Sequence, residues 1–165
     1  MSERAPRASG GLAAVDTAPE PASAFQLPEA QGSGGQAFAD FIGLRHEGPG
    51  VTRLRIEPGL LNGGGLLLGP VGFALVDYSM GSLLWSHRNP CERIATINIS
   101  LNFVQSAGEG DVECVTTLDR RNRVVAVMSS QVHHEDGRLL MTAVGCWSIY
   151  LPRGGPPLDG AQGVR

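Results

Sequence analysis

The sequence has few of the features that tie small proteins to disulfides, metals or nucleic acid. Its three cysteines are an odd number, widely spaced, with no C-x-x-C pair and no histidine at ligand spacing: Cys91, Cys114 and Cys146. This argues against a disulfide framework and against a zinc site. The 13 Lys and Arg nearly balance the 16 Asp and Glu, for a net charge of -3, without a long run of either sign. A nucleic-acid partner is therefore not expected.

Long hydrophobic runs are also lacking. The longest uncharged apolar stretch, residues 58–76, contains six glycines, Asn62 and Pro70, and Asp77 follows it directly. A membrane-spanning helix would have a cleaner apolar segment. Arg4 and Arg7 are not followed by the continuous apolar segment that a secretory signal requires. We therefore expect a cytoplasmic protein that does not associate with membranes.

Composition predicts one folded domain between two tails. In residues 1–35, 21 of the 35 side chains belong to Ala, Gly, Pro or Ser, and few are large and apolar. Such a segment cannot offset the entropy cost of ordering, so we expect it to be disordered. Residues 153–165, rich in glycine and proline, give the same expectation. The folded domain is predicted over residues 36–152, enough chain for one hydrophobic core.

A long apolar helix dominates the predicted domain. Pro70 follows a glycine-rich loop at residues 59–69 and suits the first turn of a helix, where its missing N–H has no partner to lose. The helix predicted over residues 70–85 is apolar on nearly every face, which indicates that protein surrounds it. Gly72 and Gly81 each weaken it by about 1 kcal/mol relative to alanine, a cost that close approach of a neighbour, such as a partner helix, would explain.

Strand patterns flank this helix. A short helix is predicted at residues 37–44 and a strand at residues 51–56. After the long helix, residues 94–104 alternate, and Ile97, Ile99, Leu101 and Phe103 form the face assigned to the interior. Three further strands are predicted at residues 112–118, 124–134 and 139–150, with turns at 119–123 and 135–138. The order predicts an α+β domain in which an antiparallel sheet of five or six strands wraps the central helix.

The candidate chemistry centres on Asp77, a carboxylate about two turns into the apolar helix. Burying an unpaired carboxylate is costly, so it should be hydrogen-bonded, shifted in pKa or used in a reaction; a solvent-facing Asp is the alternative. Just before the helix, the loop that contains Asn62 and Gly69 offers free N–H groups at the positive end of the helix dipole, where they can polarise a carbonyl oxygen.

The spacing of these groups predicts a dimer. Gly69 and Asp77 are eight residues apart, about 12 Å of helix rise, too far to act on one carbonyl within a single copy. An antiparallel second copy of the helix would bring the Asp77 of one chain near the Gly69 of the other. The spacing therefore predicts a two-fold dimer with two composite sites.

Over residues 38–151 the sequence resembles the PaaI-type acyl-CoA thioesterases of the hotdog fold. That family carries N-x-x-G-x-x-H-G-G-x-x-x-x-x-x-D at the start of its central helix. The corresponding residues here keep the spacing: Asn62, Gly65, Leu68, Gly69, Pro70 and Asp77. Leu68 stands in place of the motif histidine and Pro70 in place of the second glycine, so a side-chain hydrogen bond and a backbone donor are missing.

The resemblance implies a hotdog fold and a role for each matching residue. Asp77 would act as general base or nucleophile on the thioester, and the Gly69 amide would polarise its carbonyl. Asn62 would position the attacking water or the loop, and Thr96, which matches a family serine or threonine, would support the nucleophilic end. Substrate contacts are expected from Gly65, Leu68 and Pro70.

The two departures from the motif leave an alternative open. A lost hydrogen bond to a developing charge costs about 1.5 to 3 kcal/mol, so hydrolysis would be slowed by tens to hundreds of fold. The alternative is a degenerate hotdog protein that binds acyl-CoA without hydrolysing it.

Coenzyme A would bring phosphates to the protein. Arg120, Arg121 and Arg123, in the turn predicted at residues 119–123, could bind them; an ordinary solvated turn is the alternative. No metal or cofactor is expected, because coenzyme A is part of the substrate. The expected partners are an acyl-CoA and further copies of the chain, as a dimer or a dimer of dimers.

Overall fold

The structure, a computed structural model, describes residues 34–151. The tails predicted at residues 1–35 and 153–165 lie outside the described residues, except for Gly34 and Gly35, which open the first helix. The elements in chain order are α1 Gly34–Phe41, β1 Arg45–Gly48, β2 Val51–Arg55, a 3-10 turn η1 Pro58–Leu60, α2 Gly69–Ser86, β3 Arg93–Phe103, β4 Asp111–Arg121, β5 Val125–His134 and β6 Leu139–Tyr150.

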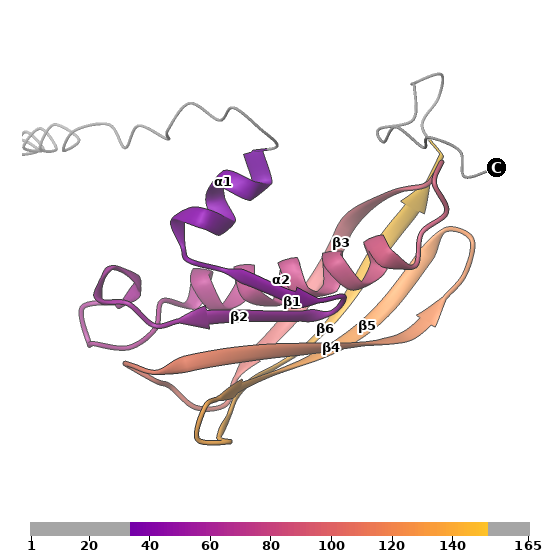
Figure 1. Cartoon of the computed structure of the whole chain (residues 1–165). Coiled ribbons are helices and arrows are strands. Elements are labelled where there is room, and N and C mark those ends of the chain that lie inside the picture. The colour runs from indigo at the N-terminus through magenta and orange to yellow at the C-terminus, as the bar shows by residue number, and fades with distance from the viewer. Residues whose placement is uncertain (1–33, 152–165) are drawn as a thin grey trace, which may run out of the picture. The chain divides into compact units, whose positions relative to one another are not determined.

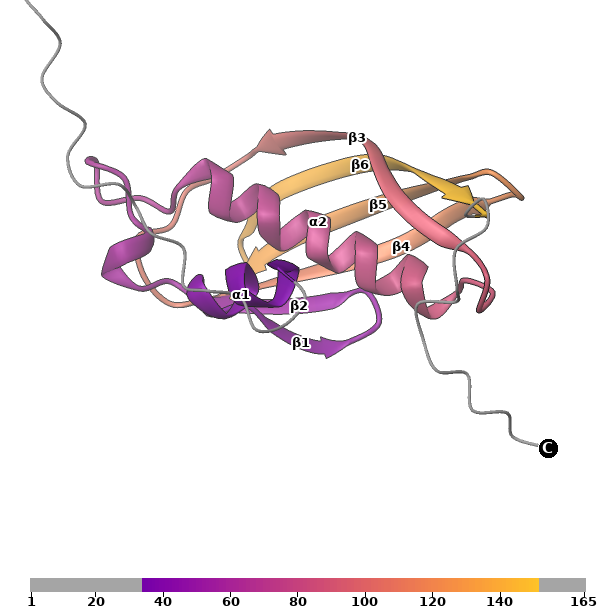
Figure 2. The same cartoon turned by 90° about the horizontal axis from the view of Figure 1, so that it is seen from above.

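The predicted α+β architecture is confirmed. Six strands form one antiparallel sheet in the order β1-β2-β4-β5-β6-β3, and α2 lies across one face of it (Figures 1 and 2). Strands β1 and β3 form the two edges. Strand β1 was not predicted, because its residues carry no apolar alternation and are nearly all exposed.

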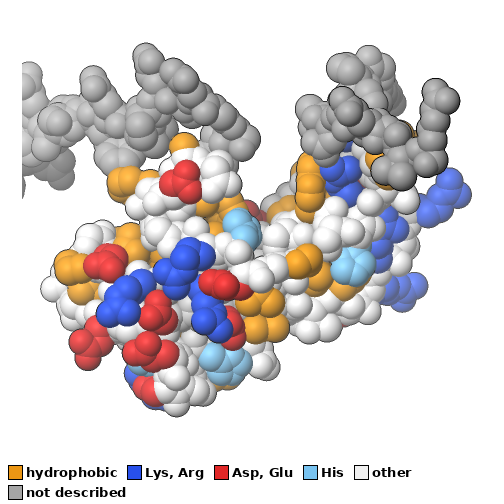
Figure 3. Space-filling model, viewed as in Figure 1, with side chains coloured by type: hydrophobic (Ala, Val, Ile, Leu, Met, Phe, Trp, Pro, Cys, Tyr) orange, Lys and Arg blue, Asp and Glu red, His pale blue; other side chains and the backbone are white. Residues whose placement is uncertain are grey.

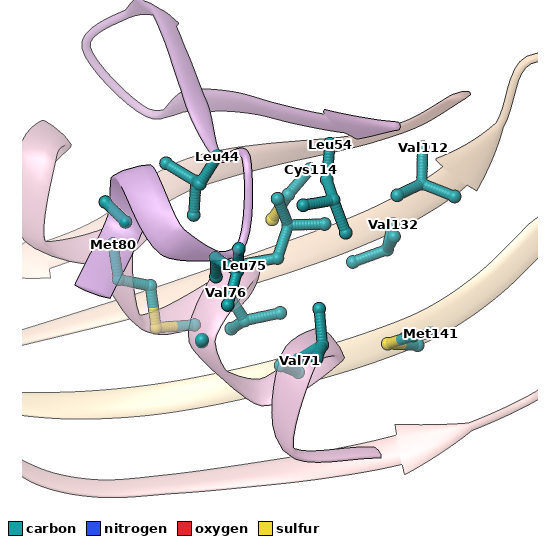
Figure 4. Close-up of a cluster of buried hydrophobic side chains, with 14 of the residues drawn as sticks. Leu44, Leu54, Val71, Leu75, Val76, Met80, Val112, Cys114, Val132 and Met141 are labelled. Atoms are coloured by element: carbon teal, nitrogen blue, oxygen red, sulfur yellow. The ribbon is translucent and has the colours of Figure 1, made fainter. Parts of the chain in front are cut away.

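The core lies between α2 and the sheet. Leu75, Val76 and Met80 of the helix are fully buried. Figure 4 shows helix side chains directed at those of β2, β4, β5 and β6, which include Leu54, Val112, Cys114, Val132 and Met141. The prediction that protein surrounds this helix is thus met chiefly by the sheet of the same chain.

The helix glycines allow this close packing. A Cβ atom on Gly72 would lie 2.6 Å from Met141 Cε, and one on Gly81 would lie 3.1 Å from Trp147 Cη2. Both neighbours belong to β6. The close neighbour expected at these two glycines is therefore the sheet of the same chain, and not a partner helix.

Strand β3 contains a β-bulge that changes which side chains face the helix. Thr96 pairs with Trp147 and Asn98 with Cys146, so Ile97 is the extra residue. Because directly opposed residues share a face, Thr96 lies on the same face as Ile99 even though three positions separate them. The assignment of Ile97 to the interior is wrong: its side chain is 58% exposed and lies outside the alternation of the strand. Phe103 stays on the face of Ile99, but at the end of this edge strand it is also 58% exposed and not part of the buried core.

Strand β4 contains a second β-bulge, within the turn predicted at residues 119–123. Strand β4 continues to Arg121, and its pairing shifts register between Leu118 and Arg120. The turn is shorter than predicted, and Asn122 organises it: its Oδ1 accepts hydrogen bonds from the N–H groups of Val124 at 2.9 Å and Val125 at 2.8 Å.

Charged side chains gather over the β1–β2–β4 end of the sheet. There Arg53 pairs with Glu113 at 2.6 Å and Arg55 with Asp111 at 3.1 Å. On the face shown in Figure 3 both signs are interspersed in this region. Ion pairs thus join the strands at this end of the sheet.

Candidate functional site at the seam between α2 and β3

Asp77 lies half-buried in the middle of α2, where the helix faces the edge strand. Thr96 Oγ1 of β3 donates a hydrogen bond of 2.9 Å to Asp77 Oδ1. Burial raises the pKa of the Asp77 carboxyl above its usual value, and the hydrogen bond from Thr96 opposes that shift. A carboxylate with a raised pKa is a stronger proton acceptor, as a general base at neutral pH requires.

The hairpin between β1 and β2 holds the helix turns on either side of Asp77. Thr52 Oγ1 donates to Leu75 O at 3.0 Å, and Ser79 Oγ donates to Gly50 O at 2.8 Å. The Gly50 N–H in turn donates to Ser82 Oγ at 3.0 Å. Thr52 and Ser79 are fully buried. Asp77 is therefore placed by a rigid polar support and not by a mobile loop.

Asp77 lines an open cavity of about 850 Å³ on the C-terminal half of α2. The walls mix aromatic, polar and aliphatic side chains, among them His46, Tyr78, Ser82, Trp85, Ile94 and Trp147. The His46 and Tyr78 rings lie 6.0 Å apart. The sequence pattern offered no reason to place His46 or Trp147 here, since both come from strands distant in sequence.

The N-terminus of α2 leaves one backbone donor free. Pro70 has no N–H, and the N–H groups of Val71 and Gly72 donate to Leu68 O at 3.0 and 3.2 Å. Within the described residues, the Gly69 N–H has no acceptor. Gly69 is thus the one residue of the first turn that can offer a hydrogen bond to a carbonyl oxygen.

Asn62 organises the loop before α2. Its Oδ1 accepts hydrogen bonds from the N–H groups of Gly64 at 2.8 Å and Leu66 at 3.2 Å. Gly65 adopts a φ of 74°, a left-handed conformation that favours glycine. Within the described residues, no hydrogen bond joins Asn62 to Asp77. Asn62 is therefore placed to shape the loop, which is one of the two roles expected of it.

The loop is held from the other side by residues that follow β3. Leu67 N–H donates to Ala107 O at 2.9 Å, and a Cβ atom on Gly108 would lie 2.5 Å from Gly65 O. Leu68 packs against the hydrophobic core, whereas Pro70 is exposed. The residue in place of the motif histidine therefore contributes packing and no hydrogen bond.

A second cavity of about 600 Å³ lies beside the N-terminal half of α2. Its lining combines the first turns of the helix with the inward face of β3: Gly69, Pro70, Phe73, Ile99, Leu101 and Phe103. The Phe103 ring packs on Gly69, where an added Cβ would lie 3.3 Å from Cζ. The seam between α2 and β3 thus carries an apolar cavity near Gly69 and a mixed cavity at Asp77.

The three predicted arginines are not brought together. Arg120 is paired across the sheet with Val127 and Arg121 with the buried Ala126, so these two arginines lie on opposite faces. Arg121 forms an ion pair with Glu92 at 2.5 Å. Only Arg121 and Arg123 line a common cavity, of about 790 Å³, near the C-terminal end of α2.

No metal centre or membrane-spanning helix is found in residues 34–151. In this part of the chain no group of three His, Cys, Asp or Glu side chains is close enough to hold a metal ion. None of its helices is both long and apolar enough to cross a membrane.

Comparison with known proteins agrees with the fold. The sequence model of the thioesterase superfamily matches residues 64–141, from the loop before α2 into β6. A search of curated proteins found no match.

Solved structures with the same fold include several bacterial proteins. The conserved protein PA5202 of Pseudomonas aeruginosa is 26% identical, with 69% of this chain and 94% of that chain covered and a TM-score of 0.63. The thioesterase HI1161 of Haemophilus influenzae is 17% identical over 75% of this chain and 86% of that chain, with a TM-score of 0.64. The BH2602 protein of Bacillus halodurans, solved with CoA, is 17% identical over 69% of this chain and 76% of that chain, with a TM-score of 0.66. The sheet wrapped on α2 and these solved structures lead to one conclusion: the chain has the hotdog fold, and its residues 64–141 are similar to the thioesterase superfamily.

Proposed function

We propose that this protein is an acyl-CoA thioesterase of the PaaI type, with Asp77 as its general base or nucleophile. The observation that carries the proposal is the setting of that carboxylate. It is half-buried in an otherwise apolar helix, bonded to one hydroxyl group, raised in pKa, and open to a cavity of about 850 Å³. A half-buried carboxylate that lines a cavity is more typical of a functional site than of a purely structural role.

The proposed reaction balances with the thioester, water and residues of two copies of this chain. As general base, Asp77 takes a proton from water, and the oxygen of that water bonds to the thioester carbonyl carbon. The carbonyl oxygen becomes negative and accepts the Gly69 hydrogen bond. When the C–S bond breaks, the thiolate leaves and takes up a proton, so the products are a carboxylic acid and a thiol. As nucleophile, Asp77 would bond to the carbonyl carbon first, and the C–S bond would break to release the thiolate and leave a mixed anhydride. Water would then hydrolyse the anhydride to the carboxylic acid and free Asp77.

The distance between the two groups supports a dimer with shared sites. Eight residues separate Gly69 from Asp77, about 12 Å along α2, so an antiparallel second helix would supply one of them. Phe73 lies midway between them in sequence and would lie closest to the two-fold axis. Its side chain is 42% exposed, unusual for a large apolar residue in the middle of this helix. The open edge of β3 presents Ile97, also exposed, beside the same seam.

The same assembly gives roles to the remaining residues. Thr96 holds Asp77 and tunes its pKa. Asn62 shapes the loop that ends at Gly69, while Gly65 permits its left-handed turn, and Leu68 and Pro70 fix where the helix begins.

Coenzyme A phosphates would bind near Arg123. That side chain is exposed, lines the 790 Å³ cavity, and has no ion pair or hydrogen bond within the described residues. Arg121 is already paired with Glu92, and Arg120 lies on the opposite face of the sheet. Of the three arginines, Arg123 is therefore the proposed phosphate contact, and Arg121 lines the same cavity.

A second function has an observation in its favour. Leu68 and Pro70 remove a side-chain donor and a backbone donor, which leaves the Gly69 N–H as the one free donor in the first turn of α2. A degenerate protein that binds acyl-CoA without hydrolysing it would show this loss.

One experiment separates the two functions. Free thiol release from acyl-CoA substrates is measured with the wild-type protein and with Asp77→Asn, which keeps the size of the side chain. Hydrolysis by the wild type that falls to background in Asp77→Asn supports the thioesterase. Acyl-CoA binding by calorimetry without hydrolysis in either protein supports the binding function.

A further inference from the structure

We infer that the 600 Å³ cavity beside Gly69, named here the apolar pocket, binds the acyl chain of the substrate, and that Leu101 and Phe73 select uncharged acyl groups. The apolar pocket consists of Gly69, Pro70, Phe73, Ile99, Leu101 and Phe103. This inference rests on the proposed function and adds the class of acyl group to it.

The apolar pocket lies between the two groups assigned to the reaction. Gly69, Phe73 and Asp77 follow one another at four-residue spacing, so they share one stripe of α2, which faces β3. The strand runs past the same stripe: Phe103 packs on Gly69, and Thr96 bonds to Asp77. A thioester carbonyl held by either end of this stripe therefore has the apolar pocket about one helix turn away.

The side chains that line the two cavities indicate which half of the substrate binds in each. No side chain of the apolar pocket carries a hydrogen-bond donor or acceptor. The thiol arm of coenzyme A contains amide groups, and burying these without partners is strongly unfavourable. The cavity at Asp77 instead offers His46, Tyr78, Ser82 and Ser86 among its aromatic walls, which suits an arm of that polarity. The apolar pocket is left for the acyl chain.

This assignment predicts a preference that can be measured. Each methylene group buried in an apolar site strengthens binding by about fourfold, so acyl chains of several carbons should be preferred to acetyl. A carboxylate at the far end of the chain would find no partner in the apolar pocket. Adipoyl-CoA should therefore be a poorer substrate than hexanoyl-CoA, which has the same length, by on the order of a hundredfold or more.

The test compares acetyl-, hexanoyl- and adipoyl-CoA with three proteins: wild type, Leu101→Trp and Val144→Trp. Tryptophan at position 101 fills the apolar pocket. Val144 belongs to β6 and is 52% exposed on the opposite face of the sheet, so the same bulk added there is the matched control. The ratio of kcat/KM for hexanoyl-CoA to that for acetyl-CoA should fall at least about tenfold in Leu101→Trp and should not change in Val144→Trp.

The outcomes separate this inference from the proposed function. Equal rates of hydrolysis for hexanoyl- and adipoyl-CoA would contradict binding of the acyl chain in the apolar pocket, and so would a hexanoyl-to-acetyl ratio of kcat/KM that Leu101→Trp leaves unchanged. Either result would still support the proposed thioesterase activity. If no substrate is hydrolysed, calorimetry of acyl-CoA binding decides. If the affinity rises with chain length and this rise is lost in Leu101→Trp, the apolar pocket binds the acyl chain in a protein that does not hydrolyse it. If the affinity is independent of chain length, the apolar pocket does not bind the acyl chain. If Leu101→Trp does not fold, Leu101→Ala enlarges the pocket and should shift the preference toward longer chains.

Discussion

Thr96 Oγ1 donates to Asp77 Oδ1 across 2.9 Å, and this hydrogen bond joins the edge strand to the central helix at the one acidic position of α2. The contact opposes the effect of burial, which raises the pKa of the Asp77 carboxyl. Two partly cancelling influences therefore set the protonation of the group that we propose as the base.

Replacement of Thr96 by alanine should move the acid limb of the pH–rate profile to higher pH. Without the hydroxyl, burial acts unopposed and the pKa of Asp77 rises further, so the active carboxylate is lost at a higher pH. The value of kcat/KM at neutral pH should fall by roughly tenfold, the usual effect of one hydrogen bond to a charged group. Thr96→Ser keeps the donor and should retain the wild-type profile. An acid limb that stays in place in Thr96→Ala would argue against Asp77 as the titrating group.

Asp77→Asn should abolish hydrolysis and raise the melting temperature at neutral pH. The folded-state pKa of Asp77 lies above its value in the unfolded chain, so the deprotonated group disfavours folding once the pH exceeds both values. The amide has no such charge. The gain should therefore be full at neutral pH, shrink as the pH falls through the raised pKa, and vanish below about 3.9, the pKa of an unfolded Asp. Thermal unfolding at a series of pH values measures it.

The control for that measurement is Asp119→Asn. Asp119 is exposed, and its Oδ1 accepts a hydrogen bond from Ser129 that an asparagine oxygen can also accept. Its replacement should change stability by less than about 0.5 kcal/mol. Equal stabilisation by both replacements would point to a general charge effect and not to the setting of Asp77.

Gly108→Ala should destabilise the protein and slow hydrolysis together. The new Cβ would lie 2.5 Å from the backbone oxygen of Gly65, and backbone cannot move aside as a flexible side chain can. The loop that ends at Gly69 must shift, at a cost of about 1–3 kcal/mol. Gly63→Ala, in the same loop with open space around it, is the matched control. Chemical denaturation and thiol release, measured on both variants, test whether the two losses occur together.

Arg123→Gln should weaken binding of an acyl-CoA without affecting binding of the corresponding acyl-pantetheine. If Arg123 contacts a phosphate at the surface, its loss should raise KM for acyl-CoA by roughly fivefold, as expected for an exposed ion pair of about 1 kcal/mol. The acyl-pantetheine thioester has no such phosphate, so its KM should not change. Arg120→Gln is the control on the opposite face of the sheet. An equal effect of both arginines would indicate only a general attraction between charges.

Most of the fold could be predicted from the sequence because its signals are strong and local. Apolar residues on all sides of residues 70–85 predicted a surrounded helix, which the structure places at Gly69–Ser86. The alternating segments that follow it are all strands. Strand β1 escaped prediction, since Arg45, His46 and Glu47 are polar and exposed at the edge of the sheet. An edge strand buries little, so it leaves little pattern.

The site was predictable in its residues and less so in its geometry. The spacing from Asn62 to Asp77 follows a family pattern, and Thr96 could be found in the same way. The bulges at Ile97 and next to Arg120 cannot be read from alternation, yet they decide whether Thr96 reaches Asp77 and whether three arginines share one surface. The cavity walls contributed by His46 and Trp147 depend on strand pairing, which no local pattern records.

The bulge at Ile97 makes β3 tolerant of a change in length. On the carboxyl-terminal side, Ile99, Leu101 and Phe103 face the helix, and on the amino-terminal side Thr96 does. Removal of Ile97 alone would give an ordinary ladder with the same side chains facing α2. Removal of Asn98 would do the same, because Ile97 would then take the outward position between Thr96 and Ile99. A chain one residue shorter at this bulge could therefore keep the Thr96–Asp77 contact, whereas a deletion elsewhere in β3 would exchange the inward and outward faces of one part of the strand. The strand can thus lose a residue only at the bulge, which lies beside the candidate catalytic carboxylate.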